Sequence, residues 1–375
     1  MNSRIGTIWP IEPHTQAKHE ILRYYLGAWF PILATAHRRL LYIDGFAGPG
    51  EYKDGEDGSP IIALKVARDH ILKRKLQRPG MDLVFFFIEV EKDRFQNLEQ
   101  KLATLQLPSN FRIEKECGTF EHAFGSALGE IEEQSKRLAP SFVFIDPFGP
   151  TGFPLSLIER LAKQPRSEVL ITFNYQALNQ WFLQDEAKQK HLDKLYGSDI
   201  WRQALHISDS RKREDYLRIA YQHAVENLGW RVRPFRMINK HNQTQYYLFF
   251  ATGYWRGMLV MKRAMWSAAP RGDFQYSDLT NPRQHLLFEE FYDEEYSHEL
   301  GDQLYKAYSG QTILKQTTLQ QDLAWHPICI ERHLTRALTI LEYESTPPRV
   351  IKIEVPNRKR KGKTYPDDCI ITFAP

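Results

Sequence analysis

The residues best suited to chemistry form the segment Leu41-Tyr42-Ile43-Asp44-Gly45-Phe46-Ala47-Gly48-Pro49-Gly50. A short apolar run ends there in a carboxylate and breaks into a glycine-rich loop, which is typical of a buried parallel strand that leads into a cofactor-binding turn. Glycine lets the backbone turn sharply and approach a ligand closely, which a Cβ atom would prevent. A dinucleotide site has Gly-x-Gly-x-x-Gly directly after the strand, whereas here Asp44 comes first.

A carboxylate at this point suits a ligand that carries an ammonium group and needs no phosphate cradle. S-adenosylmethionine has both properties, because its amino-acid end carries an ammonium group, so the segment favours this cofactor. The candidate cofactor residues of the segment are Asp44, Gly45, Phe46, Ala47, Gly48 and Gly50. A strand and turn with a structural role, and another kind of nucleotide site, are the alternatives.

A second motif, Asp146-Pro147-Phe148-Gly149, follows the apolar run 142–145. Methylation of an exocyclic amine requires acceptors that orient the amino hydrogens and an aromatic face that holds the ring. Asp146, the carbonyl of Pro147 and the ring of Phe148 supply these roles in consecutive positions, so we expect them to be catalytic. A structural Asp-Pro turn is the alternative.

Two further cofactor contacts are expected where other strands end. Glu89 follows the run 83–88 and is placed to accept hydrogen bonds from ribose hydroxyls, with Glu91 as a competing candidate. The residues expected near the adenine edge, after a third strand, are Cys117, Gly118 and Thr119. Cys117 is equally suited to a place in the core.

Strand-like and helix-like segments alternate, which predicts an α/β fold with a parallel sheet covered on both faces. The expected parallel strands are 40–44, 83–89, 111–116, 142–145 and 169–173, and the expected closing hairpin is 232–238 with 245–251. Five parallel strands finished by a hairpin with one antiparallel strand are the Rossmann-like architecture of class I methyltransferases. Ligands bind such sheets at the carboxyl ends of the strands, so Asp44, Glu89 and Asp146 are expected to meet in one crevice.

The expected domains are a methyltransferase-like domain over 1–268, with a helical insertion at about 175–228, a linker over 269–297 and a small domain over 298–375. Three short helices and a two-stranded wing in the last part predict a winged helix-turn-helix. Its basic loop and its third helix would contact nucleic acid phosphates, positioning the protein without reading sequence. The residues expected there are Arg332, Arg336, Arg358, Lys359, Arg360, Lys361 and Lys363. A flexible charged loop and a protein-binding winged helix are the alternatives.

Composition narrows the class of protein. The chain has 375 residues, 42% of them apolar and 26% charged, as in soluble proteins of one or two domains. No apolar run is long enough to span a bilayer, and residues 1–10 lack a secretion signal. Three distant cysteines and thirteen histidines form no convincing disulfide framework or metal motif. A cytoplasmic protein without a metal is therefore expected.

Taken in order, Asp44 to Gly50, Gly58-Ser59-Pro60, Phe87-Ile88-Glu89 and Asp146 to Pro150 resemble the three-Cys-motif partner protein (TcmP) family of bacteria. The likeness covers roughly residues 15–265, and the tail from about 298 resembles the winged helix-turn-helix often appended to that family. The resemblance implies a methyltransferase-like protein that binds S-adenosylmethionine through Asp44, Gly48, Gly50 and Glu89. It also implies a partner protein resembling radical enzymes that use the same cofactor.

The Asp-Pro-Phe-Gly motif is similar to the fourth motif of tRNA guanine dimethyltransferases and, more loosely, to the Asp-Pro-Pro-Tyr box of DNA amino-methyltransferases. Glycine replaces the final aromatic residue of that box, which leaves Phe148 or Tyr175 to hold a base. We therefore predict a methyltransferase acting on a nucleobase amine of RNA or DNA. A non-catalytic, cofactor-binding partner of a radical enzyme and a DNA-binding regulator are the alternatives.

Overall fold

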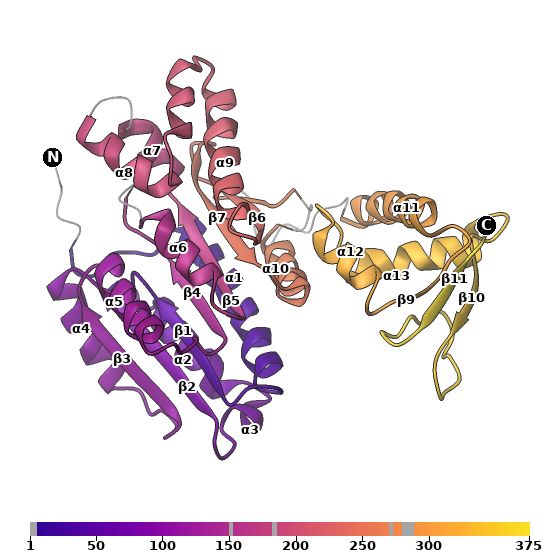
Figure 1. Cartoon of the computed structure of the whole chain (residues 1–375), viewed down its shortest axis with the longest axis horizontal. Coiled ribbons are helices and arrows are strands. Elements are labelled where there is room, and N and C mark those ends of the chain that lie inside the picture. The colour runs from indigo at the N-terminus through magenta and orange to yellow at the C-terminus, as the bar shows by residue number, and fades with distance from the viewer. Residues whose placement is uncertain (1–5, 150–152, 182–185, 270–272, 280–288) are drawn as a thin grey trace. The chain divides into compact units, whose positions relative to one another are not determined.

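The computed structural model describes residues 6–149, 153–181, 186–269, 273–279 and 289–375. The chain forms two compact units, residues 1–254 with 275–279, and residues 255–274 with 280–375 (Figure 1). Pro150, and residues 270–272 and 280–288 of the expected linker, lie outside the described residues.

An eight-stranded sheet forms the centre of the first unit, in the order β3-β2-β1-β4-β5-β7-β6-β8. Its strands are β1 (Arg39–Asp44), β2 (Asp82–Glu89), β3 (Phe111–Cys117), β4 (Ser141–Ile145), β5 (Ser167–Phe173), β6 (Arg231–Ile238), β7 (Thr244–Thr252) and β8 (Gln275–Ser277). Strands β1 to β5 are parallel, and β7 is antiparallel to both β5 and β6. The predicted Rossmann-like α/β sheet with a terminal hairpin is therefore confirmed. The strand order reverses at β1, which puts the topological switch point at Asp44.

Strand β8 lies within the segment that was expected to be a linker. Its residues Gln275–Ser277 pair in parallel with Arg236–Ile238 at the edge of the sheet. The linker prediction is therefore wrong for this stretch. Three residues are too few to show a strand periodicity in the sequence, and the pairing depends on a distant partner.

Helices cover both faces of the sheet (Figure 1). On one face, the Tyr25 ring of α1 lies 5.0 Å from that of Phe142 and 5.1 Å from that of Phe250. On the other face, Ile43 and Phe249 belong to an apolar core shared with α5, α6 and α9. The helices of this unit are α1 (Pro13–Leu33), α2 (Ser59–Asp69), α3 (Lys73–Leu76), α4 (Lys92–Ala103), α5 (Phe120–Glu133), α6 (Leu155–Ala162), α7 (Tyr175–Trp181), α8 (Glu186–Tyr196), a 3₁₀ helix (Ile200–His206) and α9 (Ser210–Glu226). The last four form the expected helical insertion.

The second unit combines helices with a small antiparallel sheet of order β10-β11-β9. Its elements are α10 (Trp255–Ala268), α11 (Glu289–Tyr308), β9 (Thr312–Leu314), α12 (Leu319–Trp325), α13 (Glu331–Thr339), a π-helical turn (Ile340–Glu344), β10 (Val350–Glu354) and β11 (Ile370–Phe373). The sheet therefore contains a third strand, β9, besides the two strands that were expected for the wing. Across the described parts of both units, no helix combines the length and apolar character needed to cross a bilayer.

Helix α10 belongs to the second unit, although it was expected to end the first domain at residue 268. Its fully buried Lys262 donates hydrogen bonds from Nζ to the carbonyls of Leu323, His326 and Cys329, at 2.7, 2.7 and 2.6 Å. The boundary therefore lies after Tyr254. The sequence of an amphipathic helix predicts that one face is buried, but not which neighbour buries it.

Candidate cofactor and substrate site

The loop after β1 is fixed to the ends of two neighbouring strands. The amide of Gly45 donates to the carbonyl of Phe144 at 2.9 Å, and the amide of Ala47 donates to that of Ile88 at 2.8 Å. Gly48 has a φ of +62°, and a Cβ atom there would meet nothing within 4 Å. The loop therefore turns through a left-handed residue beside open space in which a ligand has room.

Other expected cofactor residues of this loop are explained by packing. A Cβ atom at Gly45 would lie 2.5 Å from the ring of Phe120, and one at Gly50 would lie 2.9 Å from Leu98. The Phe46 ring also packs on Phe120, with 5.9 Å between centroids. These residues shape the loop against α5 and α4, and of Gly45, Gly48 and Gly50 it is Gly48 that adjoins open space.

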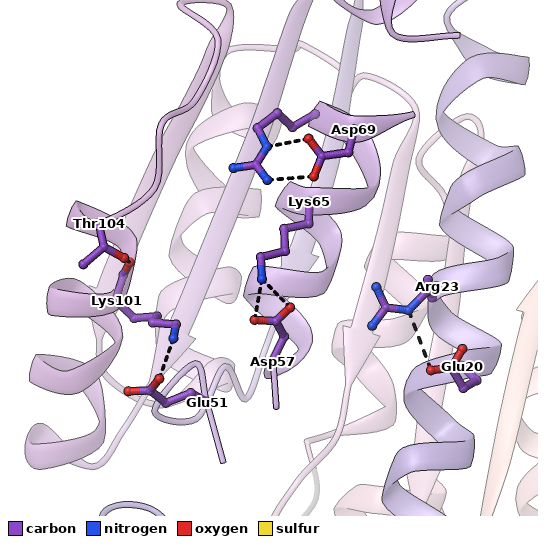
Figure 2. Close-up of polar contacts among 9 residues, drawn as sticks. Glu20, Arg23, Glu51, Asp57, Lys65, Asp69, Lys101 and Thr104 are labelled. Atoms are coloured by element: carbon purple, nitrogen blue, oxygen red, sulfur yellow. Dashed lines mark hydrogen bonds and ion pairs between the residues drawn. The ribbon is translucent and has the colours of Figure 1, made fainter. Parts of the chain in front are cut away.

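Ion pairs hold the rest of the loop in place (Figure 2). Lys101 of α4 pairs with Glu51 at 2.5 Å, and Lys65 of α2 pairs with Asp57 at 2.7 Å. Within the same loop, the amide of Gly58 donates a hydrogen bond to the carbonyl of Gly50 at 2.8 Å. Each partly exposed pair stabilises the fold by about 1 kcal/mol at most. Their main effect is to fix the shape of the loop.

Glu89 joins the glycine loop to the end of β2. Its side chain accepts hydrogen bonds from the amides of Gly48 and Glu91, both at 2.8 Å. Burial raises the pKa of Glu89, and these amide hydrogen bonds counteract the rise. Each carboxylate oxygen bound in this way keeps a lone pair for a hydroxyl donor. The competing candidate, Glu91, is exposed and contributes its backbone amide instead.

Asp44 is fully buried beneath the loop. Tyr42 Oη donates to its carboxylate at 3.2 Å, and the amide of Phe46 lies at 3.4 Å. Burial raises the pKa of Asp44 to about 7, against hydrogen bonds from Ser59, Phe46 and Tyr42, and the charge of Asp146 raises it further. A cation bound beside Asp44 would favour the ionised form.

Asp146, directly after β4, forms an ion pair with Lys18 of α1 through Oδ2. The Lys18 side chain is 6% exposed and that of Asp146 is 22% exposed. The Lys18 ammonium group also lies 5.1 Å from the centroid of the Tyr246 ring. The expected catalytic carboxylate is thus held by a buried cation from a different layer of the fold.

Phe148 lies in an aromatic corner at the surface, whereas Pro147 is buried. The Phe148 ring is 48% exposed and meets the Trp9 ring at 84°, with 5.3 Å between centroids. The guanidinium carbon of Arg94 lies 4.8 Å from the Phe148 ring and 4.9 Å from the Trp9 ring. The expected base-stacking residue is therefore exposed, but it already packs against two other side chains.

Tyr52 connects this corner to the two aspartates. Its ring centroid lies 5.9 Å from that of Trp9 and 5.7 Å from that of His19. Burial raises the pKa of Tyr52, and the charges of Asp146 and Asp44 raise it further. Burial and the neighbouring Lys18 lower the pKa of His19 to about 3, so this imidazole is neutral at physiological pH.

Reasoning from the sequence missed several residues that contact the expected site residues or one another, namely Trp9, Lys18, His19, Tyr52, Arg94 and Tyr246. For Lys18 a signal existed, because it shares the apolar stripe of α1 with Ile21, Leu22 and Tyr25. A lysine on a buried helical face needs a partner. The others are single residues whose relation to the site depends on tertiary contacts.

The remaining expected cofactor residues lie at the end of β3. The amide of Gly118 donates to the carbonyl of Glu89 at 3.1 Å, which places this turn beside the ribose candidate. Thr119 caps α5, and its side chain accepts from the amide of His122 at 3.3 Å. Cys117 is exposed. Tyr175 is only 6% exposed and belongs to the apolar core, which favours the structural interpretation of that residue.

Most of the basic residues expected to contact nucleic acid are paired within the second unit. The ion pairs are Arg332–Asp293 at 2.8 Å, Arg336–Glu294 and Arg336–Glu344 at 2.5 Å, Arg358–Asp368 at 2.6 Å and Arg360–Glu342 at 2.5 Å. Lys363 lies 4.6 Å from the centroid of the Tyr343 ring, and Lys359 and Lys361 are exposed. A phosphate would have to compete with carboxylates for the arginines, whereas the lysines are more readily available.

Within the ranges that the structure describes, no cluster of three or more His, Cys, Asp or Glu side chains could hold a metal ion. The described residues around the strand ends include the carboxylates of Asp44, Glu89 and Asp146, and the cations Lys18 and Arg94.

No family model and no curated protein matches the sequence. Among solved structures, the chain is similar to an O-methyltransferase from Bacillus cereus in complex with SAH, at 12% identity and a TM-score of 0.33, over 64% of this chain and 82% of that one. It is similar to protein LPL1258 from Legionella pneumophila, at 11% identity and a TM-score of 0.34, over 63% and 85% of the chains. A third match is a putative sarcosine dimethylglycine methyltransferase from Galdieria sulphuraria, at 11% identity and a TM-score of 0.26, over 66% and 91%. Scores of this size carry no argument about activity.

Proposed function

We propose that the first unit is an S-adenosylmethionine-dependent methyltransferase that acts on a nucleobase amine of RNA or DNA. One observation carries the proposal. The adjacent strands β2 and β1 end at one edge of the sheet in Glu89 and Asp44, and Asp146 directly follows β4 at the same edge, beside the open space at Gly48. A carboxylate set at the switch point of a wound sheet suits a nucleoside with a cationic amino-acid end.

When bound, the cofactor would supply a methyl group on a positively charged sulfur atom. Glu89 would accept hydrogen bonds from ribose hydroxyls with the lone pairs that its two amide donors leave free. Asp44 would hold the ammonium group, which favours the ionised form of this buried carboxyl group. The turn at Cys117, Gly118 and Thr119 would border the adenine.

Asp146 would orient the target amine. Lys18 bonds to Oδ2, and Oδ1 has no hydrogen-bond partner among the residues that the structure describes, so Oδ1 can accept an amine hydrogen. The exposed ring of Phe148, two residues later, offers a face on which a base can stack. With the amine held in line, positioning provides much of the rate enhancement.

The second unit would hold the nucleic acid substrate. Its order of helix, strand, two helices and two strands, from α11 to β11, is that of a winged helix, which supports the proposal. Lys359, Lys361 and Lys363 are its best candidates for phosphate contacts. The order of the motifs from Asp44 to Asp146 also supports membership of the TcmP family. The three cysteines form no disulfide, which is in keeping with a cytoplasmic protein.

Two measurements test this function. Isothermal titration with S-adenosylmethionine should show binding, and no binding at millimolar ligand would remove the proposal. Incubation of bulk tRNA, rRNA and DNA with cofactor labelled in its methyl group should label one of these pools. Asp146→Ala should abolish the labelling and leave cofactor binding intact.

A non-catalytic partner of a radical enzyme is the second candidate. The arginine pairs of the second unit favour it, because they leave few cations for phosphates. Cofactor binding without methyl transfer to any pool, together with co-purification of a radical enzyme that uses the same cofactor, would support this candidate over the first.

A further inference from the structure

Arg94 is a cation that lies against two aromatic rings, one of which is Phe148 of the second motif. Its guanidinium carbon lies 4.9 Å from the Trp9 ring and 4.8 Å from the Phe148 ring, and these rings stand at 84° to each other. Both distances are within the range of favourable cation–π contacts. Two nearly perpendicular walls therefore restrict the position of the guanidinium group before any ligand arrives.

No residue that the structure describes accepts a hydrogen bond from the N–H groups of Arg94. Among the residues that the structure describes, Arg94 makes the two ring contacts and no hydrogen bond or ion pair. Its charge lowers the pKa of Glu89, against the dominant effect of burial, so Glu89 is its carboxylate neighbour. The Glu89 carboxylate, however, is bonded to the amides of Gly48 and Glu91.

The other cation of the crevice differs in this respect. Lys18 is paired with Asp146 and buried, so its charge is neutralised inside the protein. Arg94 also lies in the first turn of α4 (Lys92–Ala103), where the helix dipole favours an anion. Among the described residues, Arg94 is thus a partly exposed cation that makes no ion pair.

We infer that Arg94 binds an oxyanion of the ligand. The inference rests on the proposed function, since the oxyanion is either the carboxylate at the amino-acid end of the cofactor or a phosphate next to the target nucleotide. A guanidinium group binds either through two parallel hydrogen bonds. The contacts with the Trp9 and Phe148 rings restrict the position of the guanidinium group in advance, which reduces the entropy lost on binding.

The experiment compares two thioether nucleosides by isothermal titration. S-adenosylhomocysteine has the amino-acid end, whereas 5′-methylthioadenosine lacks it. If Arg94 binds the carboxylate, Arg94→Gln lowers the affinity for S-adenosylhomocysteine by about 10- to 100-fold, which is the size expected for loss of a charge-assisted hydrogen bond. The affinity for 5′-methylthioadenosine is then unchanged. Arg94→Lys keeps the charge without the fork and gives an intermediate loss for S-adenosylhomocysteine. Lys92→Gln, an exposed cation of the same helical turn, is the control and leaves both ligands unchanged.

If Arg94 instead binds a phosphate of the nucleic acid, the expected changes in affinity are different. Arg94→Gln then leaves both nucleosides unchanged, weakens binding of a single-stranded 20-nucleotide RNA or DNA, and reduces the slope of log K against log salt by about 0.7. If wild type binds S-adenosylhomocysteine and Arg94→Gln alters neither nucleoside nor oligonucleotide affinity, the inference is wrong and the proposed function stands. If wild type binds no nucleoside and no oligonucleotide, both are wrong. A thermal melt checks that each variant is folded.

Discussion

The ammonium group of Lys18, on α1, is paired with the carboxylate of Asp146, the first residue after β4. This pair links the helix that covers one face of the sheet to the strand end where the target amine is expected. Because the Lys18 side chain is only 6% exposed, its charge depends on Asp146 for compensation. The pair therefore affects both stability and the orientation of Asp146.

Loss of this pair should separate the two effects. Asp146→Asn leaves a buried ammonium group and should lower the free energy of unfolding by about 2–4 kcal/mol, whereas Lys18→Met leaves the more exposed partner and should cost less. In Lys18→Met the unrestrained carboxylate should also reduce methyl transfer by about 10- to 100-fold, with cofactor affinity unchanged. Urea unfolding of both single variants and the double variant measures the coupling. Additive losses, or transfer by Lys18→Met at the wild-type rate, would contradict the assignment.

Asp44 should make both stability and cofactor binding depend on pH. Its pKa in the folded protein is about 7, above the ordinary value of 3.8. The unfolded chain therefore loses this proton first, so stability from this group is complete below about pH 4 and falls as pH rises toward 7. Asp44→Asn should remove this fall, which is on the order of 4 kcal/mol. Urea unfolding of both proteins between pH 4 and pH 8 provides the test.

The same group should release a proton when the cofactor binds. An ammonium group beside Asp44 favours the ionised carboxylate, so affinity should rise with pH up to about 7 and then level off. Titrations in buffers of different ionisation enthalpy count the protons released. An affinity in wild type that is independent of pH from 5 to 8 would show that Asp44 does not meet the cation.

Gly48 should matter for the ligand more than for the fold. It has a φ of +62° and open space where a Cβ atom would lie, and Gly229, in the turn before β6, has a φ of +93° and the same open space. Alanine at either position should cost about 1–2 kcal/mol in backbone strain. Gly48→Ala alone should weaken cofactor binding, because its methyl group enters the proposed ligand volume. Equal cofactor affinities of the two variants in a titration would place the ligand elsewhere.

The lysines and arginines of the second unit should behave differently. Replacing Lys359, Lys361 and Lys363 with Gln should reduce the slope of log K against log salt for duplex DNA by roughly 2–3. Arg336→Gln should leave the slope unchanged and destabilise the unit by about 1 kcal/mol at most, because Arg336 is paired with Glu294 and Glu344. Salt-dependent binding measurements give the slopes. A larger effect from Arg336 than from the lysines would reverse this ranking.

The sheet and its three strand-end carboxylates could be predicted because their signals are local. An apolar run, an acidic residue and a glycine loop lie within ten consecutive residues around Asp44, and alternation with helices fixes the parallel sheet. Adjacent parallel strands then bring Asp44, Glu89 and Asp146 to one edge. The inference needs no knowledge of side-chain contacts.

The second layer of the site could not be predicted in this way. Trp9 precedes α1, Tyr52 lies in the loop after β1 and Arg94 lies in α4, so their relation exists only once these three segments are packed together. Strand β8 and the placement of α10 likewise depend on distant partners. Lys18 alone gave a readable signal, as a charge on the apolar stripe of α1.

Titration of wild type and Glu89→Gln with S-adenosylhomocysteine tests the central claim most directly. Glutamine has one acceptor oxygen and an NH₂ donor in place of the second oxygen, so it can accept a hydrogen bond from only one of the amides of Gly48 and Glu91. It also lacks the negative charge that strengthens hydrogen bonds from ribose hydroxyls. We predict saturable binding by wild type and a loss of about tenfold or more in Glu89→Gln. Wild type that binds nothing at millimolar ligand, or a folded Glu89→Gln that binds as tightly as wild type, would contradict a cofactor site at this edge of the sheet.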